Sequence, residues 1–114
     1  MEQLSQPDIQ LQLAKLKDWD LINDSNIQKL KAAFPTSDYN FAIALTNAIA
    51  KLAESANHHP LIIVEYACVT VIWWTHQING LHENDFIMAA KTTELFLNVK
   101  LSLINQPDST GQNR

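Results

Sequence analysis

The chain of 114 residues contains a single cysteine, Cys68, which lies within its longest apolar stretch. One cysteine cannot form a disulfide inside the chain, so no disulfide framework supports this fold. No apolar run approaches the roughly 20 residues that a membrane-spanning helix requires. The first residues also lack the basic segment and the apolar core of a signal peptide. We therefore expect a soluble, cytoplasmic protein that has no membrane partner.

Basic charge is also scarce in this sequence. Eight Lys and Arg residues stand against twelve Asp and Glu residues, which gives a net charge of −4, and the basic residues are scattered. Binding to a phosphate backbone requires clustered Lys and Arg, so we expect no nucleic-acid partner. The apolar content of 46% and the charged content of 18% are typical of globular proteins. We expect one domain over residues 1–104, followed by a flexible polar tail over residues 105–114.

Apolar periodicity and turn residues divide the chain into helices and strands. Three helices are predicted where apolar residues recur at helical spacing behind capping residues: 5–17, 38–57 and 82–104. Either Ser37 or Asp38 can cap the second of these helices. Runs rich in β-branched and aromatic residues predict three strands: 19–23, 61–66 and 68–74.

The segment from Ile27 to Phe34 fits two interpretations. Ile27, Leu30 and Phe34 recur at helical spacing, and the lysines and alanines between them favour a helix. Leu30, Ala32 and Phe34 also alternate with other residues, as a strand returning from the turn at 23–26 would. Periodicity alone favours the helix.

The last predicted strand is apolar on both of its faces. Val69, Val71 and Trp73 share one face, whereas Ile72 and Trp74 lie on the other. A small sheet needs only one buried face for its own core. The second face therefore predicts a partner subunit or a covering loop.

Titratable side chains gather where the second helix meets the following strands. Three of the four histidines lie within the nineteen residues from His58 to His76. Glu54 precedes His58 by four residues, so the last helical turn can bring the two together. If the next two strands pair as a hairpin, His76 returns toward the edge where His58 and His59 begin. We therefore predict a pocket with three imidazoles and one carboxylate, which can donate and accept protons near neutral pH.

Other uses of these residues have weaker support. Adjacent histidines in a loop are more often structural than catalytic, and His82 is typical of a weak helix cap at the surface. A zinc site requires three or four ligands at regular spacing, and the sequence has no His-x-x-x-His pair, so we expect no metal. Cys68 lies within an apolar strand, which is typical of inert packing and not of nucleophilic catalysis.

Several of these residues together resemble a known signature. The residues that carry the resemblance are Glu54-x-x-x-His58-His59-Pro60, then Tyr66, Thr75-His76, Gly80-Leu81 and Asp85. This pattern is similar to that of the pterin-4a-carbinolamine dehydratases, and the spacings after the histidine pair match without insertion. The similarity extends more weakly over nearly the whole chain.

The resemblance implies a fold and an assembly. The fold is α+β, ordered α-β-β-α-β-β-α, with a four-stranded antiparallel sheet packed on helices on one face. That order makes the segment 27–34 a strand. The family also forms homodimers and homotetramers, which would account for the second apolar face at Ile72 and Trp74.

The resemblance also implies a reaction and roles for the site residues. The reaction dehydrates 4a-hydroxytetrahydropterin to quinonoid dihydropterin and water in tetrahydrobiopterin recycling, so the protein would be a hydro-lyase that needs no cofactor and no metal. His58 and His76 would be the catalytic acid and base, with Glu54 holding His58 in one tautomer. His59 would bind the pterin. Asp85 would either orient His76 or stabilise the start of the last helix.

The sequence departs from the family's usual pattern beside the site. Leu61 and Ile62 replace the usual Glu-Trp or similar pair after the proline, Ile72 and Trp74 occupy commonly polar positions, and His82 replaces a Ser or Thr cap. Relatives of this fold also act without catalysis, as a dimerisation cofactor of a transcription factor or an assembly helper in carbon fixation. A non-enzymatic interaction module is therefore the alternative function.

Overall fold

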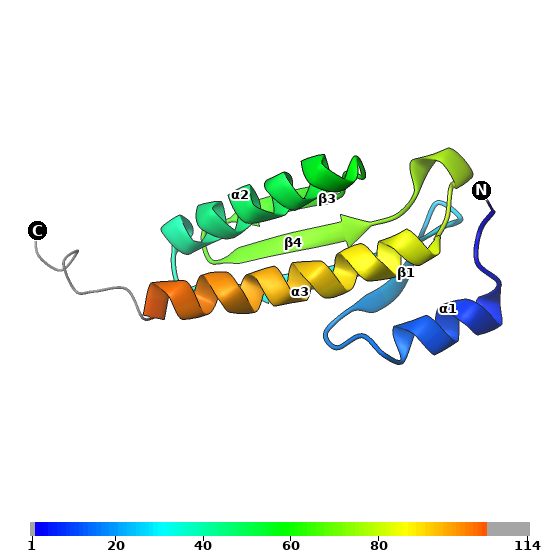
Figure 1. The fold of residues 1–114 in the computed structure, drawn as a ribbon, viewed down its shortest axis with the longest axis horizontal. Coiled ribbons are helices and arrows are strands. Elements are labelled where there is room, and N and C mark those ends of the chain that lie inside the picture. The colour runs from blue at the N-terminus through cyan, green and yellow to red at the C-terminus, as the bar shows by residue number, and fades with distance from the viewer. Residues whose placement is uncertain (1, 105–114) are drawn as a thin grey trace, which may run out of the picture.

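The computed structural model describes residues 2–104 of the chain. Its elements follow one another as α1 (Gln6–Leu13), β1 (Asp20–Asp24), β2 (Ile27–Pro35), α2 (Tyr39–Ala56), β3 (Leu61–Glu65), β4 (Cys68–Trp73), the short 3₁₀ turn η1 (His76–Ile78) and α3 (Glu83–Ile104). This is the expected α-β-β-α-β-β-α order (Figure 1). The tail predicted at 105–114 lies outside the described residues.

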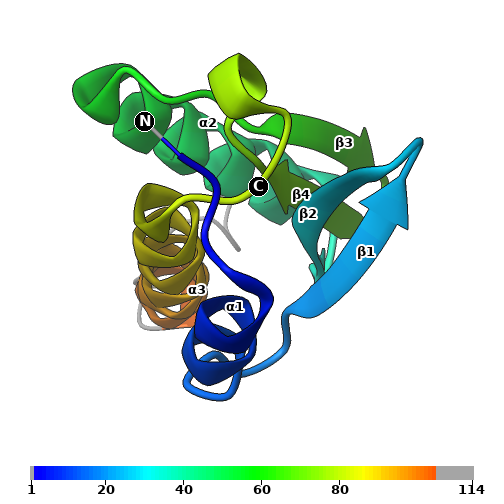
Figure 2. The ribbon, with the colours of Figure 1, turned by 90° about the vertical axis from the view of Figure 1, so that its right-hand side faces the viewer.

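The four strands form one antiparallel sheet in the order β1-β2-β4-β3. Figure 2 shows α2 and α3 on the same face of this sheet, while no helix of residues 2–104 covers the opposite face. The core between the helices and the sheet contains fully buried apolar side chains, among them Leu30, Leu45, Ile49, Val69, Val71 and Trp73. The predicted α+β class and its sheet are thus confirmed.

Residues 27–34 belong to a strand, so the helix favoured by periodicity is wrong. Leu30, Ala32 and Phe34 are buried, whereas the lysine and alanine between them are exposed. Ser25 and Asn26 have positive φ angles of 54° and 69°, which is the geometry of a tight two-residue hairpin. β2 pairs with β1 on one side and β4 on the other. These pairings override the helix propensity of the lysines and alanines.

α1 is shorter than its sequence pattern predicts. Ser5 caps its start by accepting a hydrogen bond from the backbone N–H of Asp8, but the helix ends at Leu13 and not near Lys17. After Leu13 the backbone bonds tighten to three-residue spacing, and Asp18 then takes a positive φ of 74°. These turns direct the chain into β1. Among residues 2–104, no helix is both long and apolar enough to span a membrane.

Asp38, and not Ser37, caps the long helix α2. Its side chain accepts a hydrogen bond of 2.8 Å from the backbone N–H of Phe41. We expect Asp38→Ala to lower the free energy of unfolding by about 0.5–2 kcal/mol, because one N–H at the helix start loses its acceptor. Urea denaturation measures this loss. Ser37→Ala is the matched control and should leave the midpoint unchanged; an equal loss in both variants would contradict this assignment of the cap.

Candidate active site

The three clustered histidines line one cavity. His58 and His59 follow the end of α2, where Asn57 adopts a left-handed conformation with φ of 50°. β3 pairs antiparallel with β4, so the start of β3 lies beside the end of β4. His76 follows β4 and therefore returns to the same edge. The cavity of about 340 Å³ is lined by Asn57, His58, His59, Thr75, His76 and Gln77. The predicted convergence of the three imidazoles is thus present.

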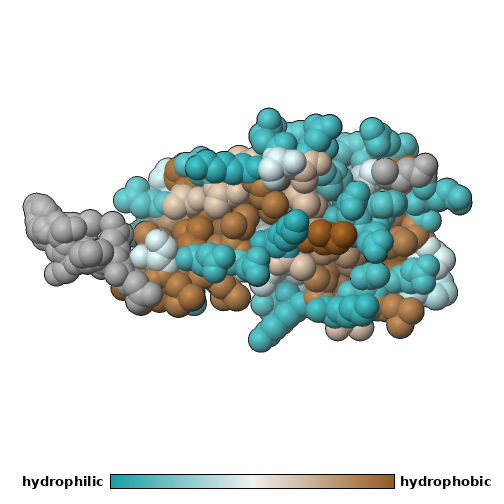
Figure 3. All heavy atoms as spheres, viewed as in Figure 1, coloured by the Kyte–Doolittle hydropathy of each residue, from teal (hydrophilic) through white to brown (hydrophobic). Residues whose placement is uncertain are grey.

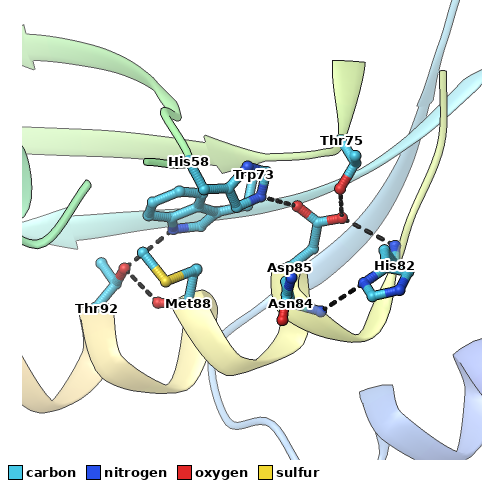
Figure 4. Close-up of polar contacts among 8 residues, drawn as sticks. All are labelled: His58, Trp73, Thr75, His82, Asn84, Asp85, Met88 and Thr92. Carbon is cyan, nitrogen blue, oxygen red and sulfur yellow. Dashed lines mark hydrogen bonds and ion pairs between the residues drawn. The ribbon is translucent and has the colours of Figure 1, made fainter. Parts of the chain in front are cut away.

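His58 contacts a fully buried carboxylate. Its Nε2 atom lies 2.6 Å from Oδ1 of Asp85, whose exposed fraction is 0%. The other oxygen, Oδ2, accepts hydrogen bonds from the Thr75 hydroxyl at 2.7 Å and from the backbone N–H of His82 at 2.9 Å (Figure 4). Asp85 therefore ties α3, the end of β4 and the end of α2 together at one carboxylate.

The hydrogen bonds of Asp85 determine which nitrogen of His58 is free. An ionised carboxylate has only acceptor atoms, so the Nε2–H of His58 is the donor to Oδ1. In the neutral ring the lone pair then lies on Nδ1. The bond to Asp85 therefore holds the neutral ring of His58 in one tautomer, with Nδ1 as the acceptor atom.

The side chain of Trp73 packs against the His58 ring. The ring centroids of His58 and Trp73 are 5.3 Å apart, and Trp73 is fully buried. The indole N–H of Trp73 donates a 3.0 Å hydrogen bond to the hydroxyl of Thr92, which in turn donates to the backbone carbonyl of Met88 at 2.7 Å (Figure 4). This chain of bonds anchors the indole to α3. The position of His58 is thus set by buried groups on two sides.

Glu54 pairs with His59, and the expected pairing of Glu54 with His58 is wrong. The Oε2 atom of Glu54 lies 2.5 Å from Nε2 of His59, and both side chains are largely exposed. The expectation assumed that the helix continues through His58, but α2 ends at Ala56. The left-handed Asn57 then turns the chain, so that His58 faces α3 and its neighbour faces back along α2. An exposed pair of this kind contributes little to stability.

Asp85 contacts His58 and the helix start; of its two predicted roles, the orientation of His76 has no hydrogen bond to support it within residues 2–104. The side-chain hydrogen bonds of histidines within residues 2–104 involve His58, His59 and His82. The proposed role of Asp85 at the start of the last helix is confirmed by its bond to the His82 N–H. His82 also acts as the expected cap, because its Nδ1 accepts from the N–H of Asn84. His76 instead stacks on Trp74, with ring centroids 4.3 Å apart.

Two groups of the site were not predicted from the sequence. Thr75 belongs to the recognised motif, but its bond to Asp85 depends on the pairing of distant segments. Trp73 was expected only as core packing, and its contact with His58 depends on how α2 ends. A larger hollow of about 900 Å³ lies elsewhere, between the start of α2 and the end of α3, and no histidine lines it. The three histidines of the motif therefore line the smaller cavity.

The fold and the cavity together define a class: a small α+β protein with a histidine-lined cavity in which two imidazoles are paired with carboxylates. The chain belongs to the pterin 4 alpha carbinolamine dehydratase family, whose model matches residues 2–95.

Relatives that carry the name of this family support the assignment. A protein of Microcystis aeruginosa is 45% identical over 83 residues, which cover 73% of this chain and 72% of the relative. A protein of Chlorobaculum tepidum is 44% identical over 92 residues, which cover 81% of this chain and 83% of the relative.

Solved structures show the same fold. The crystal structure of a transcriptional coactivator/pterin dehydratase from Brucella melitensis matches with a TM-score of 0.74 and 27% identity, covering 82% of this chain and 97% of that one. A pterin dehydratase-like protein described as a RuBisCO assembly factor in the alpha-carboxysome matches with a TM-score of 0.61 and 22% identity, covering 70% of this chain and 90% of that one. The second likeness concerns the fold alone.

Proposed function

We propose that this protein catalyses the dehydration of a 4a-hydroxytetrahydropterin to the quinonoid dihydropterin and water by histidine acid–base catalysis. The observation that carries the proposal is the cavity of about 340 Å³ lined by His58, His59 and His76. Membership of the pterin-4a-carbinolamine dehydratase family supports the choice of substrate. The cavity has the volume of a site for one small molecule.

The reaction requires one proton donor and one proton acceptor on the same substrate. The bond between C4a and the hydroxyl oxygen breaks, and the oxygen leaves as water after gaining a proton. The proton on N5 is lost, and its bonding electrons form the double bond between N5 and C4a. The substrate gains one proton at the leaving hydroxyl and loses one proton from N5, and no electrons pass to or from another molecule. The step therefore needs no redox partner. Two imidazoles that face one cavity fit this requirement.

The surroundings of the histidines suggest their roles. Asp85 fixes the orientation of His58 from a buried position, so we assign to His58 the donation of a proton to the leaving hydroxyl. His76 is exposed and has no carboxylate partner among the described residues, so we assign to it the removal of the N5 proton. His59, oriented by Glu54 at the mouth of the cavity, would bind the pterin. The carboxylate partner of the catalytic His58 is then Asp85 and not Glu54.

The wild-type protein provides the first test. We expect micromolar protein to accelerate the dehydration of chemically generated 4a-hydroxytetrahydropterin, followed by stopped-flow ultraviolet absorbance, well above the spontaneous rate. The control is the same concentration of heat-denatured protein. A rate equal to the spontaneous one across neutral pH would reject the proposal.

An interaction role is the second candidate, because apolar side chains are exposed along α2 and α3. They include Ile43, Leu97, Leu101, Leu103 and Ile104, and Figure 3 shows apolar side chains gathered toward the end of α3, on the left of the view. Exposed apolar surfaces of this kind mark interfaces with proteins, including further copies of the same chain. The names of the two solved relatives mention coactivation and RuBisCO assembly. A protein with only this role would give no acceleration in the dehydration assay.

A further inference from the structure

His76 differs from the other two cavity histidines in what holds it. Asp85 and Glu54 orient His58 and His59, but among the described residues no side-chain hydrogen bond orients the ring of His76. His76 is exposed and begins the short turn η1. An exposed imidazole without a partner exchanges freely between rotamers. A catalytic base requires a restricted position, because misplacement of a reacting group by about 1 Å can cost 10²-fold in rate.

The contact that restricts His76 is the indole of Trp74. The two ring centroids are 4.3 Å apart and the rings are inclined by 35°. Trp73, the last residue of β4, is fully buried, and the half-buried Trp74 that follows it packs partly against the core. The Trp74 ring also contacts Lys29, which lies on the face of β2 opposite to the buried Leu30. That face has no covering helix among residues 2–104 (Figure 2).

Lys29 of β2 is the side chain that holds this indole. Its Nζ atom lies 3.9 Å from the centroid of the Trp74 ring, the arrangement of a cation–π contact. The register of β2 and β4 pairs Leu30 with Trp73, and one residue further on it brings Lys29 opposite Trp74. Lys29 is only 8% exposed, which is unusual for a lysine. Its position is therefore set by contacts on the sheet and not by solvent.

Asp24, at the end of β1, completes the arrangement. The Nζ atom of Lys29 donates a 2.9 Å hydrogen bond to Oδ2 of Asp24. This bond, with the positive charge of Lys29, lowers the pKa of Asp24 below its ordinary value of 3.8. Asp24 thus stays ionised at neutral pH, and its bond to Nζ of Lys29 helps to hold that atom over the indole. Asp24 of β1, Lys29 of β2 and Trp74, which follows β4, form a series of contacts that ends at His76.

We propose that Lys29 and Trp74 are positioning residues that hold the imidazole of His76 at the cavity. The expected effect of Lys29 and Trp74 on catalysis rests on the proposed function. Their expected effect on the position of the His76 ring does not. Lys29 contacts the indole of Trp74 and restricts its position. The imidazole of His76 stacks on this indole, and only a few orientations of the imidazole preserve the stacking contact. The residues act through His76 and do not touch the substrate.

Nuclear magnetic resonance of the His76 ring tests the positioning directly. In the wild type, the ring current of the indole should move the His76 ring protons upfield relative to those of His82, with assignments from a His76→Gln variant. Trp74→Leu should remove this displacement, Trp74→Phe should retain part of it, and Lys29→Met should reduce it. The matched control is Lys31→Met, because Lys31 lies on the same face of β2 but makes no contact with the Trp74 ring. Circular dichroism shows whether each variant is folded.

The dehydration assay supplies the second measurement. We expect Trp74→Leu to lower kcat about 10- to 100-fold and Lys29→Met about two- to fivefold, with partial recovery in Trp74→Phe. An unchanged His76 resonance in folded Trp74→Leu, or the same resonance change in Lys31→Met as in Lys29→Met, would overturn the proposal. If the wild type does not accelerate dehydration, the proposed function fails, but the response of the His76 resonance still decides the positioning.

Discussion

His58→Gln and His76→Ala should each lower kcat for dehydration of 4a-hydroxytetrahydropterin about 10²- to 10⁴-fold, the usual contribution of a general acid or base. A loss of this size corresponds to about 3–5 kcal/mol of transition-state stabilisation. Glutamine at position 58 can still donate a hydrogen bond to Asp85, so it removes proton transfer without leaving the buried carboxylate unpaired. His76 is exposed, so alanine at that position leaves no buried polar group unpaired and removes only the stacking contact with Trp74.

The fourth histidine provides the matched control for these variants. His82 lies outside the cavity lining, and its Nδ1 accepts a hydrogen bond from the N–H of Asn84. His82→Asn retains an acceptor at this helix start and should keep kcat within about twofold of the wild type. Stopped-flow kinetics at saturating substrate measure all three variants. Losses below about tenfold in both His58→Gln and His76→Ala would rule out the acid–base assignment.

Asp85→Ala should have the largest effect on stability among the polar residues of the site. The substitution leaves the N–H of His82 and the hydroxyl of Thr75 without their buried acceptor and removes the partner of His58. Each buried group left without a hydrogen bond costs about 1–3 kcal/mol, and losing one partner of a buried ion pair costs about 3–5 kcal/mol. We expect a loss of about 3 kcal/mol or more in the free energy of unfolding, measured by urea denaturation.

Asp85→Asn separates the structural role of this residue from its catalytic role. The amide oxygen can accept from Thr75 and from the N–H of His82, as Oδ2 does now. The amide NH₂ group then faces Nε2 of His58, which must become an acceptor, so the proton moves to Nδ1. We expect Asp85→Asn to be clearly more stable than Asp85→Ala, but to lose at least about 10²-fold in kcat, because the tautomer of His58 is wrong. Equal activity in Asp85→Asn and the wild type would show that Asp85 acts only in folding.

The site shows why a buried carboxylate can be retained in a chain of this size. Asp85 accepts three hydrogen bonds, of which one comes from the start of α3, where a negative charge is favoured by the helix dipole. The contacts join three segments that are distant in sequence. The same bonds that fasten α3 to the end of β4 therefore orient His58. One carboxylate therefore serves both the attachment of α3 and the geometry of the site.

Local sequence signals predicted most elements of this fold. Ser5 and Asp38 cap α1 and α2 as expected, and the β-branched runs around position 70 form β3 and β4. The prediction from periodicity failed at residues 27–34, where lysine and alanine favour a helix in isolation. Pairing with β1 and β4 supplies hydrogen bonds on both edges of that segment and buries Leu30, so the tertiary environment outweighs the local preference.

The members of the site can be recognised in the amino-acid order: three histidines lie at the junction of a helix and two strands, in a spacing that resembles the dehydratase signature. Which carboxylate pairs with which histidine depends on the folded arrangement. Helical spacing paired Glu54 with His58, but the left-handed turn at Asn57 directs His58 to Asp85 on α3. The physical reason is that composition and spacing are local properties, whereas a hydrogen bond between residues 27 positions apart depends on how separate elements pack together.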